Sequence, residues 1–147
     1  MGDAPTPATR QPLNPGDGFA SVTVNVTRTD LVRYAGASGD FNPIHHSDRA
    51  AHELGLATPI AHGMWTMGRA LSEVTAWLAT TGRAADDLVG YAVRFTRPVP
   101  VPDTAEGTAL QIAGTVSSVT DDLVTIQVDV TVDDQTVLGN AKVEVRP

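Results

Sequence analysis

Residues 38–45 read SGDFNPIH and combine an acidic side chain, an amide, a proline and a histidine within eight positions. Asp, Asn, Pro and Gly are common in turns for backbone reasons alone, but a turn has no need of a histidine. A carboxylate and an imidazole held near one point can take a proton from a reacting group and return it. Asp40 and His45 are therefore the first candidates for acid–base chemistry.

Asp40 and His45 can meet only if the backbone between them bends. Residues five apart in an α-helix lie on different faces, and Pro43 disfavours a helix here in any case. Asn42 and Pro43 are residue types that fix a bent loop, and such a loop can aim both side chains at one point. Without His45, the same residues would indicate only an ordinary turn.

The elements that must hold this loop are indicated by the periodicity of the apolar residues. Residues 19–27 alternate valines with polar residues and predict a strand. Thr27 and Asp30 have the spacing of a capping box, which predicts a short helix that runs out at Gly36 and Gly39. A second short helix is predicted over residues 47–55, between a serine cap and a terminal glycine.

One long helix and several strands follow this region. Residues 62–82 carry apolar side chains at steps of three and four with few charges, which predicts a helix buried on most sides. The rest of the chain predicts about four strands, the first with Val89, Tyr91, Val93 and Phe95 pointing inward. Connections as short as DD and DDQ favour hairpins. The expected fold is α+β, with an antiparallel sheet wrapped around one long central helix.

Composition limits the domain count and the function classes. The 147 residues suffice for one domain, expected over residues 18–147 after a flexible, proline-rich leader over residues 1–17. The net charge of −7 disfavours nucleic acid and anionic lipid as partners. There is no cysteine for disulfides or thiolate chemistry. No apolar run resembles a membrane span or secretory signal, so a cytoplasmic location is expected.

The stretch YAGASGDFNPIHHSD, followed by AHGMWTMG, resembles the signature of the MaoC-like (R)-specific enoyl hydratases and 3-hydroxyacyl dehydratases. The family pattern is an aromatic residue, then Ser/Thr-Gly-Asp-x-Asn-Pro-(Leu/Ile/Val)-His, and then His-Gly-Met. The matching residues are Tyr34, Ser38, Gly39, Asp40, Asn42, Pro43, Ile44, His45, His62, Gly63 and Met64. RFTRPVPVPD resembles the family's strand after the helix. The resemblance covers most of the chain and implies a single hot-dog fold. Within the family, the chain resembles the actinobacterial B-type (3R)-hydroxyacyl-ACP dehydratase subunits.

The resemblance also implies a hydro-lyase of fatty acid metabolism that needs no cofactor and no metal. It would hydrate trans-2-enoyl thioesters of coenzyme A or acyl carrier protein to (3R)-hydroxyacyl thioesters, or dehydrate them in reverse. Asp40 would activate the water and His45 would exchange the Cα proton, or the roles would be reversed. Gly63 opens the long helix and would donate its N–H to the developing enolate. The expected substrate-binding residues are Asn42, Met64, Trp65 and Met67, with core packing as the alternative for the last three.

The other histidines have simpler explanations. His62 precedes a buried helix, where an imidazole bonded to the backbone is the expected role. A metal site made of Asp40, His45 and His62 would have a suitable set of ligands. Its spacing is not a recognised ligand pattern, however, and hydration needs no metal. His46 and His52 are expected on the surface.

Partners and rival functions follow from the fold and the charges. Arg69, Arg94 and Arg97 are candidates for contacts with the phosphates of coenzyme A or a phosphopantetheine arm. A single hot dog leaves a sheet edge exposed, so a homodimer is expected, with a heterodimer with a companion hot-dog subunit as the alternative. The rival functions are a non-catalytic hot-dog partner subunit or acyl-binding module, and a hot-dog thioesterase.

Overall fold

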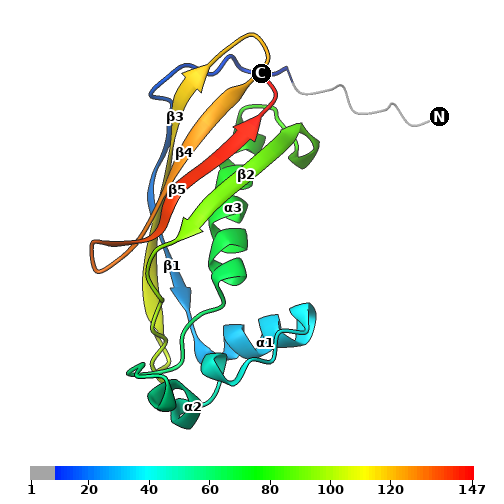
Figure 1. Ribbon diagram of the computed structural model, residues 1–147. Helices are drawn as coiled ribbons and strands as arrows, with labels where there is room; N and C mark the ends of the chain where they lie inside the picture. The colour runs from blue at the N-terminus through cyan, green and yellow to red at the C-terminus, as the bar shows by residue number, and fades with distance from the viewer. Residues whose placement is uncertain (1–8) are drawn as a thin grey trace, which may run out of the picture.

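The computed structural model describes residues 9–147, which form a curved antiparallel sheet with a long helix against its concave face (Figure 1). The strands are β1 (Gly18–Val26), β2 (Leu88–Phe95), β3 (Thr108–Val119), β4 (Val124–Val132) and β5 (Gln135–Val145). The helices are α1 (Arg28–Ser38), α2 (Asp48–Glu53) and α3 (Gly63–Thr80), with short 3-10 turns at Pro43–His45 and Ala85–Asp87. The expected α+β plan, an antiparallel sheet around one long helix, is confirmed.

The strands lie in the order β1-β3-β4-β5-β2, and every neighbouring pair is antiparallel. β3, β4 and β5 follow one another as hairpins, as the short acidic connections predicted. Asp133 and Asp134 make the second connection with φ of 47° and 60°, the positive values that a two-residue type I′ turn requires. β2 pairs with β5, so the C-terminal strand lies beside the segment that follows α3.

The core lies between the sheet and one face of α3. The buried residues of that helix are Thr66, Ala70, Val74 and Leu78, spaced four apart. The expectation that this helix is buried on most sides is wrong for the single chain, because the sheet covers only one of its faces (Figure 1). Met64, in the first turn of α3, is 57% exposed. No helix within residues 9–147 is long and apolar enough to cross a membrane.

The alternation expected in β2 is only partly correct. Tyr91 and Val93 pack against the core, whereas Val89 is 48% exposed and Phe95 is 52% exposed. The register of β2 against β5 shifts between Leu88 and Gly90, which marks a β-bulge. A bulge adds one residue to a strand and reverses the faces that follow, so Leu88 takes the inward position that the pattern gave to Val89.

The predicted leader falls partly outside the described residues, because residues 1–8 are not described. Residues 9–17 contact the domain. Leu13 is buried in the core, and the N–H of Gly16 donates to the carbonyl of Val116 at 2.9 Å. For this part of the chain the structure differs from the expected free segment, because an apolar side chain among the prolines anchors it.

Candidate active site

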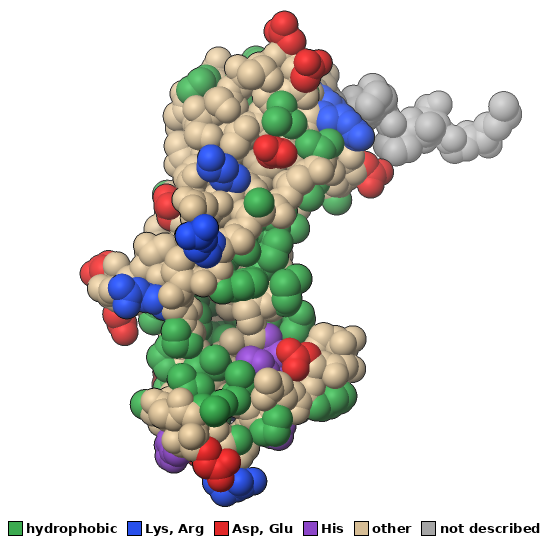
Figure 2. All heavy atoms as spheres, viewed as in Figure 1, with side chains coloured by type: hydrophobic (Ala, Val, Ile, Leu, Met, Phe, Trp, Pro, Cys, Tyr) green, Lys and Arg blue, Asp and Glu red, His purple; other side chains and the backbone are tan. Residues whose placement is uncertain are grey.

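A cavity of about 620 Å³ opens where α1, the start of α3 and the ends of β2 and β5 meet. Its polar wall consists of Tyr34, Ser38, Asp40, His45 and His62. Its apolar wall includes Met64, Phe95, Val99, Val137 and Leu138. The space-filling view shows histidine and acidic side chains together in a hollow surrounded by apolar surface (Figure 2). The cavity therefore offers a carboxylate and imidazoles to a mostly apolar ligand.

The loop that carries Asp40 is built from side chains that bond to nearby backbone. The capping box of Thr27 and Asp30 begins α1 as predicted, and the helix continues through Gly36 to end at Gly39 with φ of +78°. Ser38 Oγ then accepts from the N–H of Asp40 at 3.2 Å. Asn42 Oδ1 accepts from the N–H of Ile44 at 3.2 Å and starts the 3-10 turn that carries His45. This is the bent loop that the sequence predicted.

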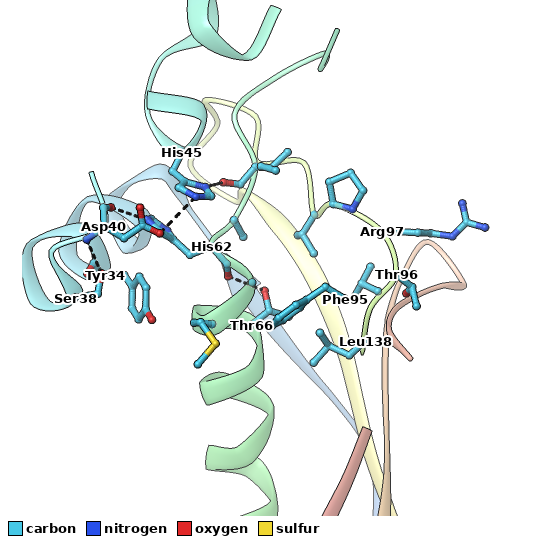
Figure 3. Close-up of a pocket in the computed structure, with 17 residues that line it drawn as sticks. Tyr34, Ser38, Asp40, His45, His62, Thr66, Phe95, Thr96, Arg97 and Leu138 are labelled. Atoms are coloured by element: carbon cyan, nitrogen blue, oxygen red, sulfur yellow. Dashed lines mark hydrogen bonds and ion pairs between the residues drawn. The ribbon is translucent and has the colours of Figure 1, made fainter. Parts of the chain in front are cut away.

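The bend brings Asp40 and His45 together at the cavity wall (Figure 3). His45 Nε2 lies 3.9 Å from Asp40 Oδ2. His45 Nδ1 lies 2.7 Å from the carbonyl oxygen of Ile60. A carbonyl oxygen only accepts, so Nδ1 carries the hydrogen, and Nε2 of the neutral ring presents a lone pair toward Asp40.

The two side chains have different environments. The His45 side chain is only 9% exposed, whereas that of Asp40 is 51% exposed. Burial lowers the pKa of His45 below its ordinary value of 6.5, and the neighbouring His62 and His46 lower it further. The bond to Ile60 and the charge of Asp40 oppose this shift in pKa without cancelling it. At neutral pH the His45 ring is therefore a neutral proton acceptor.

His62 lies next to both side chains and occupies the N-cap position of α3. Its Nε2 lies 3.1 Å from the backbone carbonyl of Asp40, and its ring stacks on that of His45 with a centroid distance of 3.7 Å and an interplanar angle of 24°. The ring of Tyr34 packs against the His62 ring with a centroid distance of 4.8 Å and an interplanar angle of 60°. The backbone-bonded role expected from the sequence is present, and the stacking on His45 is an additional contact.

The segment before α3 is held against the strand region that follows β2. The N–H of Ala61 donates to the carbonyl of Val99 at 2.9 Å, and Ile60 forms an isolated antiparallel bridge with Pro100. These bonds fix the position of the Ile60 carbonyl that orients His45. They also fix the start of α3 relative to the loop.

Gly63 is the first residue of α3, whose start has no side-chain cap. The N–H groups of this first turn therefore have no side-chain acceptor, and the positive end of the helix dipole points into the cavity region. A Cβ atom at Gly63 would lie only 2.9 Å from Cε1 of Phe95. The glycine thus lets the Phe95 ring pack directly against the backbone at the start of α3.

The other residues predicted to bind substrate are divided by the structure. Met64 lines the cavity, whereas Asn42, Trp65 and Met67 do not. The side chain of Asn42 bonds to the backbone of its own loop. Trp65 packs against the core, which was the alternative expected for it.

The three arginines predicted to meet phosphates differ in their position relative to the cavity. Arg97 is exposed and lines the cavity, and Arg69 is paired with Glu73 at 2.6 Å. Arg94 does not line the cavity. The apolar wall residues on β5, Val137 and Leu138, were not predicted, because nothing local in the sequence connects them to the loop. The resemblance of RFTRPVPVPD to the family strand was the available signal for Phe95, Thr96 and Arg97.

The alternative of a metal site can be tested on the geometry of its three candidate ligands. Asp40, His45 and His62 each offer a ligand atom within 4.8 Å of the others. Imidazole nitrogens bind metals in the plane of the ring, so two ligating rings must point at a common centre. The rings of His45 and His62 are stacked at 3.7 Å with an interplanar angle of 24°, so their planes do not meet close to the nitrogen atoms. The geometry fits a shared water better than a metal ion.

Comparison with known proteins gives relatives of the expected kind. The chain is 39% identical over 85 residues to 3-hydroxyacyl-thioester dehydratase X of Mycobacterium tuberculosis, across 58% of this chain and 28% of that protein. It is 30% identical over 89 residues to the (R)-specific enoyl-CoA hydratase of Rhodospirillum rubrum, across 60% of each. The chain thus spans less than two thirds of the length of these relatives.

Solved structures give the same fold. A MaoC-like dehydratase superposes with a TM-score of 0.82 at 33% identity, over 91% of this chain and 40% of that one. The ChsH1-ChsH2 complex of Mycobacterium tuberculosis superposes with a TM-score of 0.76 at 22% identity, over 90% of this chain and 97% of that one. The expected hot-dog fold is confirmed. Residues 12–135 match the MaoC like domain, and the chain belongs to that family.

Proposed function

We propose that the protein catalyses the reversible addition of water to trans-2-enoyl thioesters, giving (3R)-hydroxyacyl thioesters. The observation that carries this proposal is the pair of Asp40 Oδ2 and His45 Nε2, 3.9 Å apart at the wall of a largely apolar cavity. Hydrogen bonds of about 2.8 Å to both atoms leave an angle of about 90° at a shared water oxygen, so one water can contact both. Membership of the MaoC-like family and the names of the relatives support the same reaction.

In the proposed mechanism His45 moves the proton and Asp40 holds the water. The His45 ring is neutral at its lowered pKa and has a free lone pair on Nε2. As the water oxygen bonds to Cβ, one water proton moves to Nε2, while the Asp40 carboxylate accepts a hydrogen bond from the other O–H. The double-bond electrons move to the thioester oxygen and form an enolate. Nε2 then returns its proton to Cα on the same face, so both side chains end as they began.

The enolate oxygen is proposed to lie at the N-terminus of α3. The N–H of Gly63 would donate to it, and the helix dipole would stabilise the negative charge as it develops. Gly63 lines the cavity, and the absence of a Cβ lets its backbone lie close to the Phe95 ring at the cavity wall. In the dehydration direction the same donor would hold the enolate formed when His45 removes the Cα proton.

The acyl chain is proposed to lie against the apolar wall formed by Met64, Phe95 and Leu138. The carrier would be coenzyme A or an acyl carrier protein, whose phosphates Arg97 could meet. We propose a homodimer as the working assembly. A heterodimer with a companion hot-dog subunit is the alternative.

The test is the loss of enoyl-thioester absorbance with trans-2-enoyl-CoA and enoyl-carrier-protein substrates of several chain lengths. The wild-type protein should form the (R)-alcohol, and Asp40→Asn should lower kcat by about two orders of magnitude, the loss expected when the reacting water is no longer held in place by the carboxylate. Near-normal turnover by Asp40→Asn, or an (S) product, would contradict the mechanism. Absence of turnover, also with the companion subunit added, would favour an acyl-binding module, and thioester hydrolysis would indicate a thioesterase.

A further inference from the structure

We propose that His62 is a positioning residue that holds Asp40 and His45 in their reactive arrangement, an inference that rests on the proposed function. His62 contacts the backbone of one member of the pair and the ring of the other, and it immediately precedes Gly63. The His62 side chain thus lies beside all three groups of the proposed mechanism: Asp40, which holds the water, His45, which moves the proton, and Gly63, which binds the enolate.

The bond to Asp40 is directional. The carbonyl of Asp40 only accepts, so His62 Nε2 carries a hydrogen and donates it over 3.1 Å. This bond ties the loop after α1 to the first residues of α3, which lie 22 positions further along the chain. The Asp40 side chain is half exposed, and within residues 9–147 its one hydrogen bond is accepted from the nearby N–H of Asn42. The backbone bond from His62 is therefore the long-range contact that sets where its carboxylate can reach.

The stacking contact acts on His45. The two rings lie 3.7 Å apart, which blocks rotation of the His45 ring on that side, while the Ile60 carbonyl fixes the ring edge. Together they leave Nε2 aimed at Asp40. The titratable groups that face His45 are Asp40, His62 and His46. Of these, His62 is the one that stacks on its ring.

His62 also carries a feature that packing alone does not explain. Among the residues that the structure describes, its Nδ1 is the one buried side-chain nitrogen or oxygen without a hydrogen-bond partner. The residue is only 2% exposed, and an unpaired buried acceptor lowers stability. A phenylalanine would fill a similar space and stack on His45 without that penalty. The imidazole is therefore better explained by its Nε2 donor than by its contribution to the core.

Two substitutions separate the two contacts. His62→Phe keeps a flat ring over His45 and removes the donor to Asp40, whereas His62→Gln can keep an N–H donor and removes the ring. We expect His62→Phe to lower kcat at least tenfold with KM changed less than threefold, and its unfolding midpoint to equal or exceed that of the wild type. His62→Gln should retain a higher kcat than His62→Phe when the pH-independent kcat of each variant, taken from its pH profile, is compared. His52→Phe, an exposed histidine on α2, is the matched control and should change neither quantity.

The outcomes that would overturn the inference are distinct from failure of the proposed function. Wild-type kcat in His62→Phe would overturn it. So would a kcat loss that follows a lowered unfolding midpoint and disappears on cooling, because that indicates a structural role. The second readout is NMR titration of the His45 ring, which needs no turnover. We expect its midpoint to move to higher pH in His62→Phe, since the neighbouring imidazole lowers the pKa of His45; an unmoved midpoint and unmoved ring shifts would overturn the inference even if the protein is not a hydratase.

Discussion

Asp40 and His45 differ in burial, and that difference assigns their parts in the proposed reaction. His45 is buried and bonded at Nδ1 to a carbonyl, so its one free nitrogen faces the carboxylate. Asp40 is open to solvent and can hold a water that enters the cavity. The sequence had left open which residue handles the water proton. The environment of the ring favours His45 as the base.

The pH dependence of kcat/KM tests this assignment. His45 accepts a proton only when neutral, so activity should be full above its pKa and fall as pH decreases through it. Because burial lowers that pKa, the inflection should lie below 6.5. The measurement is kcat/KM with an enoyl-CoA substrate from about pH 4 to about pH 8, a range that covers both sides of the ordinary histidine pKa. An activity that rises as pH falls through this region would instead make the protonated ring the reactive form.

Gly63 provides a second test at the residue scale. The Cβ of Gly63→Ala would meet the Phe95 ring at 2.9 Å, and the ring, being 52% exposed, can move without unfolding the protein. We expect kcat/KM to fall by about 10²-fold, the loss that a misplacement of about 1 Å causes. Gly68→Ala is the matched control, since a Cβ there on the same helix meets nothing within 4 Å. Equal activity of the two variants would remove Gly63 from the proposed oxyanion site.

At the scale of elements, α3 has two separate tasks. Its first turn faces the cavity with Gly63 and Met64, and its later turns anchor it to the sheet through one buried row. A helix fixed along only one face can hold its N-terminus in place because Val74 and Leu78 are completely or almost completely buried. The stability of this row therefore supports the geometry of the site from a distance.

Two leucines on α3 test how unevenly the helix is anchored. Leu78 is buried at 2% exposure, whereas Leu71 is only partly buried against the core. Leu78→Ala should lower the free energy of unfolding by about 2–5 kcal/mol through lost burial and the cavity left behind. Leu71→Ala should cost clearly less. Urea denaturation at one protein concentration measures both, and equal losses would mean that the outer face of α3 is covered as well.

At the scale of the whole molecule, the sheet formed by residues 9–147 has β1 and β2 as its two edge strands, and no other described strand pairs with their outer sides. Open edges invite pairing with another chain, and proteins usually cover them or pair them. The bulge in β2 and the exposed Val89 lie on one of these edges. Phe95, the last residue of β2, lines the cavity, so the candidate site lies beside this edge strand.

The assembly prediction follows from these edges. Light scattering after size-exclusion chromatography should give a mass of twice the 15.4 kDa of the single chain. A measured mass of one chain would contradict the homodimer. It would direct the search to a companion hot-dog subunit, which should then raise both the mass and the turnover when added.

The sequence by itself determined the local parts of this protein. The capping box at Thr27, the bent loop from Asp40 to His45 and the alternation of the strands depend on neighbours within a few residues, so their residue types are sufficient to predict them. The resemblance to the MaoC-like family was likewise carried by short contiguous motifs. The chemistry expected of Asp40 and His45 could therefore be stated before any coordinates.

Only the tertiary structure decided which distant segments complete the site. Val137 and Leu138 reach the cavity because β5 pairs with β2, and His62 stacks on His45 because the start of α3 meets the loop after α1. The exposure of Val89 follows from a bulge that depends on the strand beside it. The pKa of His45 is lowered by burial, which is a property of the packed molecule. Contacts between residues far apart in the chain leave no periodic pattern in the sequence, because the competition among possible pairings is resolved only by packing the whole core.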